Sequence, residues 1–599
     1  MNRYQYRLSS LREYMKKEGI TVYYVPTADY HGSEYISDHF KIREYLSGFT
    51  GSAGTLFVTE TEAGLFTDGR YFTQAEQELM GSGITLYRSG MEHVPSVEEK
   101  LCELLTSGSV LGFDGRLVSF SFIDRLKKML KDTCVSFRSD AFLPATLWPD
   151  RPALVSHPAY RLELCYAGKS TKDKLSELRG FLDNETPGVD ACLISSLDDI
   201  AWLFNIRGTD ILYNPVVLSY ALITKTDAYL YLFSEAESTS LTESLSADGV
   251  TLRNYDDIYD DLRGLNLKSL LLDATKTNYA LTACIPSGVT LKDGVGPIPL
   301  AKAIKNETEQ QNLRIAHQKD GVALTKFMYW LKKSIGKEPI TELSAADKLL
   351  ALRKEQEGFL EPSFETISAY NENAAMMHYT ATQDSFSVLR PKGFLLVDSG
   401  GQYPQGTTDV TRTYVLGEVP LLWKQHYTAV LRGMLALSDA RFLYGCRGVN
   451  LDILARGPLW QMGLDYRCGT GHGVGYLLNV HEAPNGFRWK IVPERNDSCI
   501  LEEGMVTTDE PGVYIEGSHG IRIENELLCQ SDEKNEYGRF LSFETLTLTP
   551  IDLEAVLPDE MTQREKEVLN VYHKKVRETL LPFMNEDEAA WLTEVTKAI

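Results

Sequence analysis

The sequence predicts an α/β protein made of three successive domains. Short runs rich in β-branched and aromatic residues alternate with helical patterns along the chain. The first two segments repeat one order of strand, polar loop and hairpin. Proline-containing stretches near 144–158 and 297–305 interrupt these patterns. We therefore expect domains at 1–155, 156–305 and 306–599, which agrees with a usual domain size of about 150 residues or more.

Both N-terminal segments are expected to contain a strand, a loop and a two-stranded hairpin. In the first segment the expected elements are a helix at 10–18, strands at 21–25, 55–59 and 64–67, a glycine-rich turn at 48–54 and a helix at 71–80. In the second they are strands at 191–195, 220–224 and 228–233, a helix or turn at 197–204 and a polar loop at 205–210. Residue identity between the copies is low, so the repeat rests on element order alone.

The third segment begins with a capped helix, because Asn306 and Glu309 have the spacing of a capping box. Longer strands are then expected at 393–397, 408–414, 504–508 and 520–527. A capped helix from Thr562 to Leu581 and a shorter helix at 585–599 complete the chain as a helical extension.

The composition is that of a folded, acidic protein. Hydrophobic residues make up 43% of the chain, and 61 Lys and Arg against 83 Asp and Glu give a net charge of −22. A field of this sign repels phosphate backbones, which argues against nucleic-acid binding. No apolar run is long enough for a membrane span, and Met1–Ser10 lacks a signal-peptide pattern. Nine dispersed cysteines without a CxxC pair fit a reducing compartment, so we expect a cytoplasmic protein without a membrane partner.

Two aspartates of the third segment stand at the ends of apolar strands. Asp398 ends one strand, Asp409 follows eleven residues later in the next, and the turn residues 401–406 lie between them. A hairpin would bring the two carboxylates side by side, where they repel unless a proton or a cation neutralises them. A strand-end acid that caps a loop is the alternative for either aspartate alone, whereas the pair favours a metal.

Three more stretches add ligand-type side chains to this pair. His472 lies in a loop of four glycines, and Glu510 ends a strand that runs into a Pro-Gly turn. Glu524 belongs to a strand in which charged and other residues alternate, which in an ordinary strand is the solvated face. Four carboxylates and one imidazole suit an ion such as Mn²⁺ better than a thiolate-type Zn²⁺ site, and they carry enough charge for two metals.

The strings LVDSG, GTTDVTRT, GTGHGVG, VHE, TDEPGVY and GIRIEN are together highly specific. In this order they resemble the metallopeptidases of the pita-bread fold, which include aminopeptidase P, prolidase and methionine aminopeptidase. Over nearly its whole length the chain is similar to the long, three-domain, cytosolic form of Xaa-Pro aminopeptidase. Upstream, FTGSAGT, TDGRYF and IAWLFNIRG resemble that form's two creatinase-like domains. The resemblance implies two creatinase-like α/β domains, at 1–155 and 156–305, before a pita-bread catalytic domain at 306–599.

The resemblance also implies roles for the metal ligands. Asp398 is expected to bind one metal, and Asp409 and Glu524 to bridge two. His472 and Glu510 are expected to bind the other. Two divalent ions are implied, with Mn²⁺ favoured and Zn²⁺ or Co²⁺ as alternatives.

Further residues match positions around the substrate. His378 corresponds to a histidine that orients substrate, and His481 to one that stabilises the intermediate or moves a proton. Arg522 and Tyr514 match residues around the metals, and Arg70 is expected to reach the site from the first domain.

Cys468 departs from the family, which usually carries a histidine at this position. A neutral thiol lacks the two ring nitrogens of imidazole, so substrate binding at this position is expected to differ. We interpret Cys468 as a tolerated replacement and not as a nucleophile, because no base remains to activate it.

The implied function is release of the N-terminal residue from peptides with proline in second position. A metal-bridging hydroxide would attack the Xaa–Pro carbonyl, and Glu510 would pass a proton to the leaving nitrogen. Prolidase, which acts on Xaa-Pro dipeptides, is the first alternative, although typical prolidases have a single N-terminal domain. A non-catalytic peptide-binding module and a metal-free creatinase are further alternatives, and the filled ligand positions disfavour both.

The C-terminal segment suggests a homodimer. Trp591 lies near the chain end, where an aromatic residue usually needs cover, and aromatic residues are enriched at interfaces. The long form that this chain resembles is a dimer built through its catalytic domain. We therefore expect a homodimer to which the C-terminal segment contributes.

Overall fold

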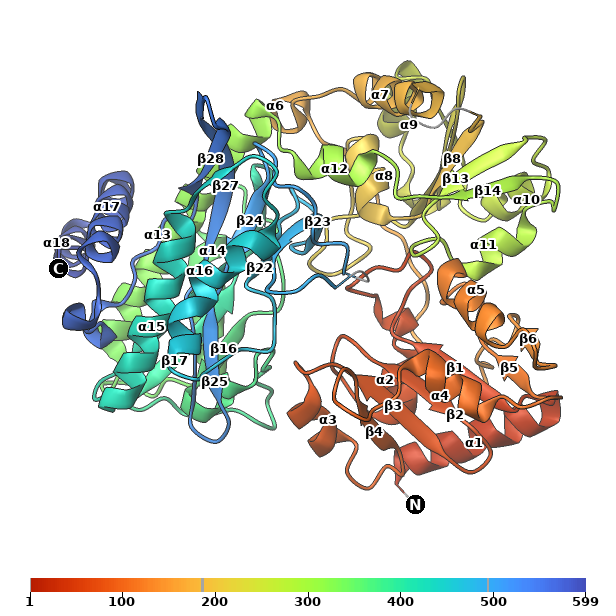
Figure 1. Ribbon diagram of the computed structural model, residues 1–599, viewed down its shortest axis with the longest axis horizontal. Helices are drawn as coiled ribbons and strands as arrows, with labels where there is room; N and C mark the ends of the chain where they lie inside the picture. Colours follow the sequence, from red (N-terminus) through yellow and green to blue (C-terminus); the bar gives the residue numbers. More distant parts are fainter. Residues whose placement is uncertain (1, 185–187, 493–494) are drawn as a thin grey trace. The chain divides into compact units, whose positions relative to one another are not determined.

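The computed structural model describes residues 2–184, 188–492 and 495–599 (Figure 1). The chain forms two compact units. The first comprises Met1–Leu162 and Lys169–Ile298, and the second comprises Glu163–Gly168 and Pro299–Ile599.

The first sheet of unit 1 has the strand order β4-β3-β2-β1-β5-β6. Its strands are β1 (Val22–Pro26), β2 (Thr55–Val58), β3 (Ala63–Thr67), β4 (Thr85–Arg88), β5 (Val110–Gly112) and β6 (Ser136–Arg138). The helices of this part are α1 (Arg3–Glu18), α2 (Ile42–Ser47), α3 (Phe72–Glu78), α4 (Val97–Leu104) and α5 (Phe120–Met129). The predicted hairpin of β2 and β3 is confirmed. Helix α1 begins earlier than predicted, because Asn2 and Gln5 form a capping box that starts it at Arg3.

The second sheet of unit 1 has the order β12-β11-β10-β8-β13-β14. Its strands are β8 (Ala191–Ile194), β10 (Ser219–Thr224), β11 (Ala228–Leu232), β12 (Val250–Asn254), β13 (Ser269–Leu272) and β14 (Thr290–Asp293). The helices here are α7 (Thr171–Asn184), α8 (Leu197–Leu203), α9 (Thr239–Ala247), α10 (Asp257–Arg263) and α11 (Tyr279–Cys284), and β7 (Tyr160–Arg161) pairs with β9 (Ile206–Arg207).

The two sheets repeat one topology, which confirms the predicted repeat. In the first sheet, β1 is antiparallel to β2 and parallel to β5. In the second sheet, β8 is likewise antiparallel to β10 and parallel to β13. In each, the second hairpin strand is parallel to the following strand. Element order therefore predicted the repeat where residue identity could not.

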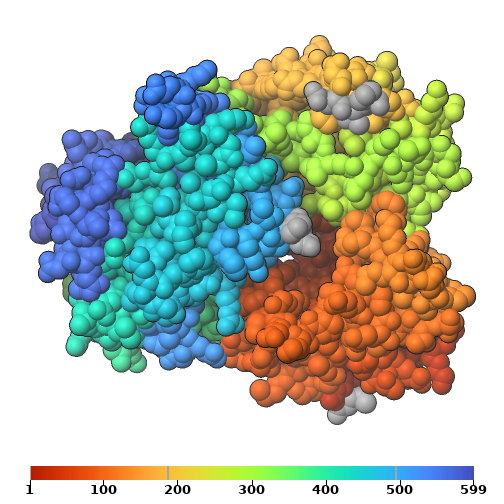
Figure 2. All heavy atoms as spheres, viewed as in Figure 1, coloured from red at the N-terminus to blue at the C-terminus, as the bar shows by residue number. Residues whose placement is uncertain are grey.

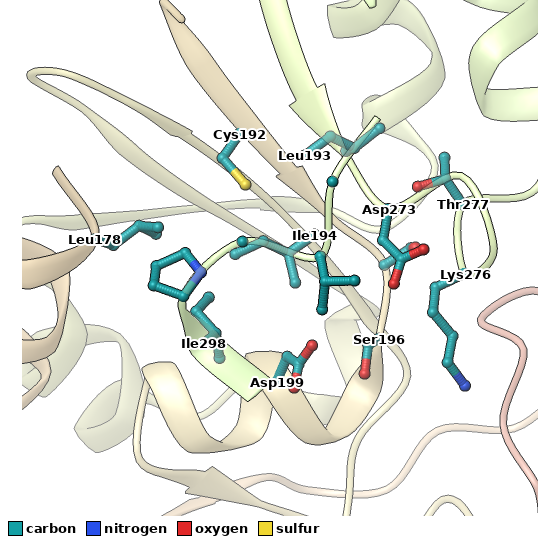
Figure 3. Close-up of a pocket in the computed structure, with 15 residues that line it drawn as sticks. Leu178, Cys192, Leu193, Ile194, Ser196, Asp199, Asp273, Lys276, Thr277 and Ile298 are labelled. Carbon is teal, nitrogen blue, oxygen red and sulfur yellow. The ribbon is translucent and has the colours of Figure 1, made fainter. Parts of the chain in front are cut away.

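A small hollow lies at the carboxyl ends of β8 and β13 (Figure 3). Leu193 and Ile194 line it on one side, and the carboxylates of Asp199 and Asp273 are among its polar groups. It contains none of the predicted site residues, so the candidate site has to be sought in unit 2.

Unit 2 is built around two antiparallel sheets and two small ones. The first has the order β16 (Ile367–Tyr370), β17 (Phe394–Ser399), β20 (Val410–Val415). The second has the order β21 (Arg441–Leu443), β28 (Gly538–Thr545), β27 (Asn525–Asn535), β24 (Val506–Asp509), β22 (Gly471–Gly473), β23 (Glu482–Phe487). The small sheets are β15 (Glu361–Pro362) with β18 (Gly401–Tyr403) and β19 (Gly406–Thr407), and β25 (Gly512–Ile515) with β26 (His519–Arg522).

The helices of unit 2 pack against these sheets or against one another (Figure 1). They are α6 (Leu164–Ala167), α13 (Glu307–Ser334), α14 (Glu342–Lys354), α15 (Leu421–Ser438), α16 (Gly448–Gln461), α17 (Gln563–Leu580) and α18 (Glu586–Val595), and α12 (Ile298–Ala303) leads into the unit. The capping box of Asn306 and Glu309 starts α13 as predicted. Buried residues of α15, such as Val430 and Leu431, share a core with Ile521 of β26.

The predicted strand 520–527 is wrong as a single element. It is divided between β26 and β27, which belong to different sheets, and Ile523 and Glu524 lie at the break. The alternating charges are not on a solvated face either, because Arg522, Glu524 and Glu526 are 4%, 1% and 0% exposed. The alternation therefore marks a buried polar site.

No helix in the described part of the chain is both long and apolar enough to cross a bilayer.

Candidate metal centre

Strands β17 and β20 bring the first two acids together. The strands are antiparallel, with Asp398 opposite Thr411, and Asp409 immediately precedes β20. Asp398 and Asp409 are both buried. The predicted hairpin is thus confirmed, although the small strands β18 and β19 form a second hairpin within its connection.

Glycines allow the strand that carries His472 to lie close to its neighbours. A Cβ at Gly471 would overlap the carbonyl oxygen of Thr508, and one at Gly473 would overlap that of Glu482. The glycine-rich loop therefore serves a close approach of backbones, with β22 held between β23 and β24.

The remaining acids come from the ends of strands around His472. Glu510 follows β24, and its N–H donates to the carbonyl of Thr470. Glu524 lies between β26 and β27, and its N–H donates to the carbonyl of Thr411. Strand ends from both larger sheets therefore converge on one place.

The ligand atoms of Asp409, His472 and Glu524 lie within 4.8 Å of one another. His472 Nε2 is 3.3 Å from Asp409 Oδ2 and 3.6 Å from Glu510 Oε1. The other imidazole nitrogen, Nδ1, is 2.9 Å from the carbonyl oxygen of Gly473. If Nδ1 carries the proton, as this contact favours, Nε2 is left as an acceptor that faces the carboxylates.

Burial close to one another raises the pKa values of two of the acids. Burial raises the pKa of Asp409 well above its usual range, and the charges of Asp398 and Glu510 raise it further. Burial also raises the pKa of Glu524, together with the charges of Asp409 and Glu510. Positive charge added between these buried acids would offset their mutual repulsion.

Arg522 supplies one such charge, but to Asp398. Its Nη2 donates to Asp398 Oδ2 at 2.5 Å, and its Nη1 donates to the Tyr514 hydroxyl at 2.7 Å. Among the described residues, the buried Oδ1 of Asp398 finds no hydrogen-bond donor. The oxygen-rich donor set, with one oxygen lacking a donor and two acids of raised pKa, fits divalent cations.

Three residues that the sequence did not indicate form hydrogen bonds with the predicted ligands. Thr411 Oγ1 donates to Glu524 Oε2 at 2.8 Å, and Thr508 Oγ1 accepts from the N–H of His472 at 3.0 Å. Glu526 Oε1 accepts from the N–H of Asp409 at 2.6 Å. Glu526 could have been identified only if the alternating charges had been recognised as buried.

Of the predicted substrate residues, His481 lies beside this cluster. The ring of His481 lies 4.2 Å from that of His472, edge to face. His378 lies on the segment that follows the short helix η3 (Asn371–Ala375), which packs against β26. Arg70 belongs to unit 1, where its Nε and Nη2 donate to the carboxylate of Asp68, so its role in the site stays a prediction.

Cys468 is half-buried, beside the core that contains α15 and β26. Burial raises the pKa of its thiol to about 11, and the charge of Glu510 contributes to the shift. A thiol with this pKa is neutral at physiological pH, which disfavours a nucleophilic role.

Comparisons with known families agree with this architecture. The sequence model of metallopeptidase family M24 matches residues 311–531, and that of the C-terminal region of these peptidases matches 539–599. Two models of the creatinase/prolidase N-terminal domain match residues 7–141 and 150–309.

Relatives are similar over the full length. A probable Xaa-Pro aminopeptidase P of Paracoccidioides brasiliensis (strain Pb03) is 38% identical over 615 residues, which cover 99% of each chain. A probable Xaa-Pro aminopeptidase P of Botryotinia fuckeliana (strain B05.10) is 39% identical over 608 residues, covering 98% of this chain and 91% of that protein.

Solved structures agree as well. The X-prolyl aminopeptidase from Caenorhabditis elegans, described as a cytosolic enzyme with a dinuclear active site, has a TM-score of 0.93 and 33% identity over 100% of both chains. The prolidase from Pyrococcus horikoshii OT3 has a TM-score of 0.50 and 26% identity, and it covers 64% of this chain and 99% of its own. The prolidase alternative is therefore not favoured.

Two creatinase-like domains, a pita-bread domain and a converging set of acids and imidazole define a metallopeptidase. The chain belongs to metallopeptidase family M24, and the full-length relatives named above are probable Xaa-Pro aminopeptidases. It is accordingly a hydrolase, and the non-catalytic alternative is not favoured.

Proposed function

We propose that this chain releases the N-terminal residue from peptides whose second residue is proline. The observation that carries the proposal is the convergence of Asp409, His472 and Glu524, with Asp398 and Glu510 beside them. This convergence occurs in a chain that is similar over its full length to Xaa-Pro aminopeptidases.

We infer that the site takes two divalent ions, with Mn²⁺ favoured and Zn²⁺ or Co²⁺ as alternatives. Asp398 would hold one ion, Asp409 and Glu524 would be shared, and His472 and Glu510 would hold the other. Such ions supply Lewis-acid polarisation of a carbonyl and a nucleophile at neutral pH. The dinuclear active site of the C. elegans enzyme supports the number of ions.

The side chains around the ions have roles that follow from their chemistry. The acidic pocket attracts the free α-amino group of a peptide. His481, beside His472, donates a hydrogen bond to the developing oxyanion, and His378 orients the bound peptide. Glu510 transfers a proton to the leaving imino nitrogen of proline. Arg522 neutralises Asp398 and orients Tyr514.

A tripeptide and a dipeptide substrate distinguish an Xaa-Pro aminopeptidase from a prolidase. We expect purified protein loaded with Mn²⁺ to release the first residue of a tripeptide Xaa-Pro-Xaa, and a chelator to stop the reaction. A dipeptide Xaa-Pro should be cleaved poorly. Preferred cleavage of the dipeptide would favour prolidase, and full activity in chelator would contradict the metal-dependent mechanism.

We also propose a homodimer to which the C-terminal segment contributes, although Trp591 no longer supports it. Its ring lies 5.5 Å from that of Tyr329 on α13, so its own chain covers it. The proposal rests instead on the aromatic side chain of Phe583, which directly follows α17 and is 47% exposed; the C-terminal helices are shown in blue in Figure 2. Light scattering should find a dimer for the intact protein and a weaker one for Phe583→Glu. A monomeric intact protein would refute the dimer.

A cytoplasmic location is proposed on two grounds. All nine cysteines are free thiols, and the C. elegans enzyme is described as cytosolic. Fractionation of cells with an antibody against the chain would test the location.

The domain boundaries after residues 155 and 305 also stay predictions.

A further inference from the structure

A single buried carboxylate outside the metal centre organises the segment that carries His378. Glu342 is the first residue of α14, and its side chain is 0% exposed. Its Oε1 accepts from the N–H of Tyr370 at 2.7 Å and from Asn373 Nδ2 at 2.9 Å. Its Oε2 accepts from the Tyr379 hydroxyl at 2.9 Å and from the N–H of Ser387 at 2.6 Å.

These four bonds reach both ends and the middle of residues 370–387. Tyr370 ends β16, Asn373 lies in η3, Tyr379 is the neighbour of His378, and Ser387 leads back towards β17. The N–H of Glu342 also donates to the carbonyl of Ser387 at 3.1 Å. The segment is therefore pinned to the start of α14 at several points.

The charge of Glu342 is what makes this arrangement strong. A carboxylate accepts several hydrogen bonds at once, and charge-assisted bonds are stronger than neutral ones. Burial raises the pKa of Tyr379, and the negative charge of Glu342 raises it further, so the tyrosine remains a donor to the carboxylate. An uncharged replacement could not accept from all four donors.

A second contact links the same segment to the metal centre. Gly520 of β26 lies so close to η3 that a Cβ there would overlap the carbonyl of Ala374. Two residues later the same strand carries Arg522, which pairs with Asp398. The segment that Glu342 pins therefore rests directly on a strand of the site.

We propose that Glu342 is a positioning residue for substrate, which acts by fixing the segment that carries His378 against β26. This inference rests on the proposed function and on the predicted role of His378. Glu342 touches neither substrate nor metal, so its effect on catalysis passes through the segment at 370–387.

The test is the variant Glu342→Gln, which keeps size and burial. Where its NH₂ group takes the place of Oε2, the Ser387 N–H loses its acceptor and the Tyr379 hydroxyl can no longer donate to this side chain. We expect kcat/KM for a tripeptide Xaa-Pro-Xaa to fall by about tenfold or more, since small misplacements near a reacting bond are costly. Metal content should stay at the wild-type value, and hydrogen exchange should rise in residues 370–387 but not in β17 and β20.

Two comparisons exclude a merely structural role. In a His378→Ala background, Glu342→Gln should lower kcat/KM by less than about twofold, because residues that act as one unit are not additive. The exposed Glu355, at the other end of α14, provides the matched control, and Glu355→Gln should behave as wild type. Tyr379→Phe serves as a second variant in case Glu342→Gln fails to fold. It removes only one of the four bonds, so we expect a smaller loss of kcat/KM, about threefold.

Additive losses in the double variant would overturn the inference, as would normal kcat/KM or unchanged exchange in Glu342→Gln. If Glu342→Gln does not fold, normal kcat/KM in Tyr379→Phe would overturn it. A wild-type protein that cleaves no Xaa-Pro peptide would contradict the proposed function instead. The exchange measurement would then still decide whether Glu342 holds the segment.

Discussion

Replacing Asp409 by asparagine should change stability with opposite signs in the absence and presence of metal. Asp409 is buried among acids, and its ligand atom lies within 4.8 Å of that of Glu524. Two unit charges at that distance repel by about 3 kcal/mol at an effective dielectric constant of ~20. The raised pKa values relieve part of this repulsion, so we expect Asp409→Asn to stabilise the metal-free protein by about 1–3 kcal/mol.

For a unit of this size, that gain corresponds to a rise in Tm of roughly 2–6 °C in chelator. With Mn²⁺ the order reverses, because binding to the folded state adds about 4 kcal/mol at a thousandfold excess over Kd. The wild type should gain this stabilisation, and the variant should lose most of it.

Differential scanning calorimetry with chelator and with Mn²⁺ measures both effects. Asp320→Asn is the matched control, because Asp320 is equally buried but accepts two hydrogen bonds from Arg353, at 2.7 and 2.9 Å. The same substitution there should lower Tm in chelator and leave the response to Mn²⁺ intact. A lower Tm of Asp409→Asn in chelator, or a wild-type response to Mn²⁺, would refute the reasoning.

Three further predictions concern single residues. The variant His481→Ala should retain its metals, and its kcat should fall by about 10²–10³-fold because one hydrogen-bond donor to the oxyanion is removed. Steady-state kinetics and metal analysis measure the two effects. Loss of the metals would show that His481 is a ligand. Cys468→Ser should keep most activity and Cys468→His should keep or improve it, and an inactive serine variant would show that the thiol is required. Burial, together with Arg412 and Arg577, lowers the pKa of His573 from 6.5 to about 3. The unfolded chain therefore takes up the proton first, and stability falls as pH drops below about 6.5, by about 2 kcal/mol at pH 5. His573→Gln should show a smaller fall in Tm between pH 7 and 5, and an unchanged fall would exclude His573 as its source.

Most of the predicted ligands could be singled out from the sequence because they stand at recognisable local places, although their role as ligands stays a prediction. Asp398 lies near the end of the apolar strand β17, Glu510 directly follows β24, and His472 is surrounded by glycines that the close approach of β22 requires. The hairpin of β17 and β20 followed from the turn residues between two strands. At these positions the strands and turns expected from the neighbouring residues are the ones that the structure contains.

The residues that hold the ligands could not be predicted, because their importance depends on burial. Glu526 was indistinguishable from a solvated charge until its 0% exposure and its bond to Asp409 were known. The break at Glu524 was missed because the sequence 520–527 alternates regularly across two strands of different sheets. Trp591 was misjudged because its cover comes from α13, more than 250 residues earlier in the chain.

A metal titration followed by peptide cleavage tests the central claim most directly. Metal-free protein would be titrated with Mn²⁺ while bound metal and the release of the first residue from Xaa-Pro-Xaa are both measured. We expect that activity rises from the background level and reaches its plateau at two ions per chain. Full activity without bound metal, or binding of two ions without release of the first residue, would contradict it.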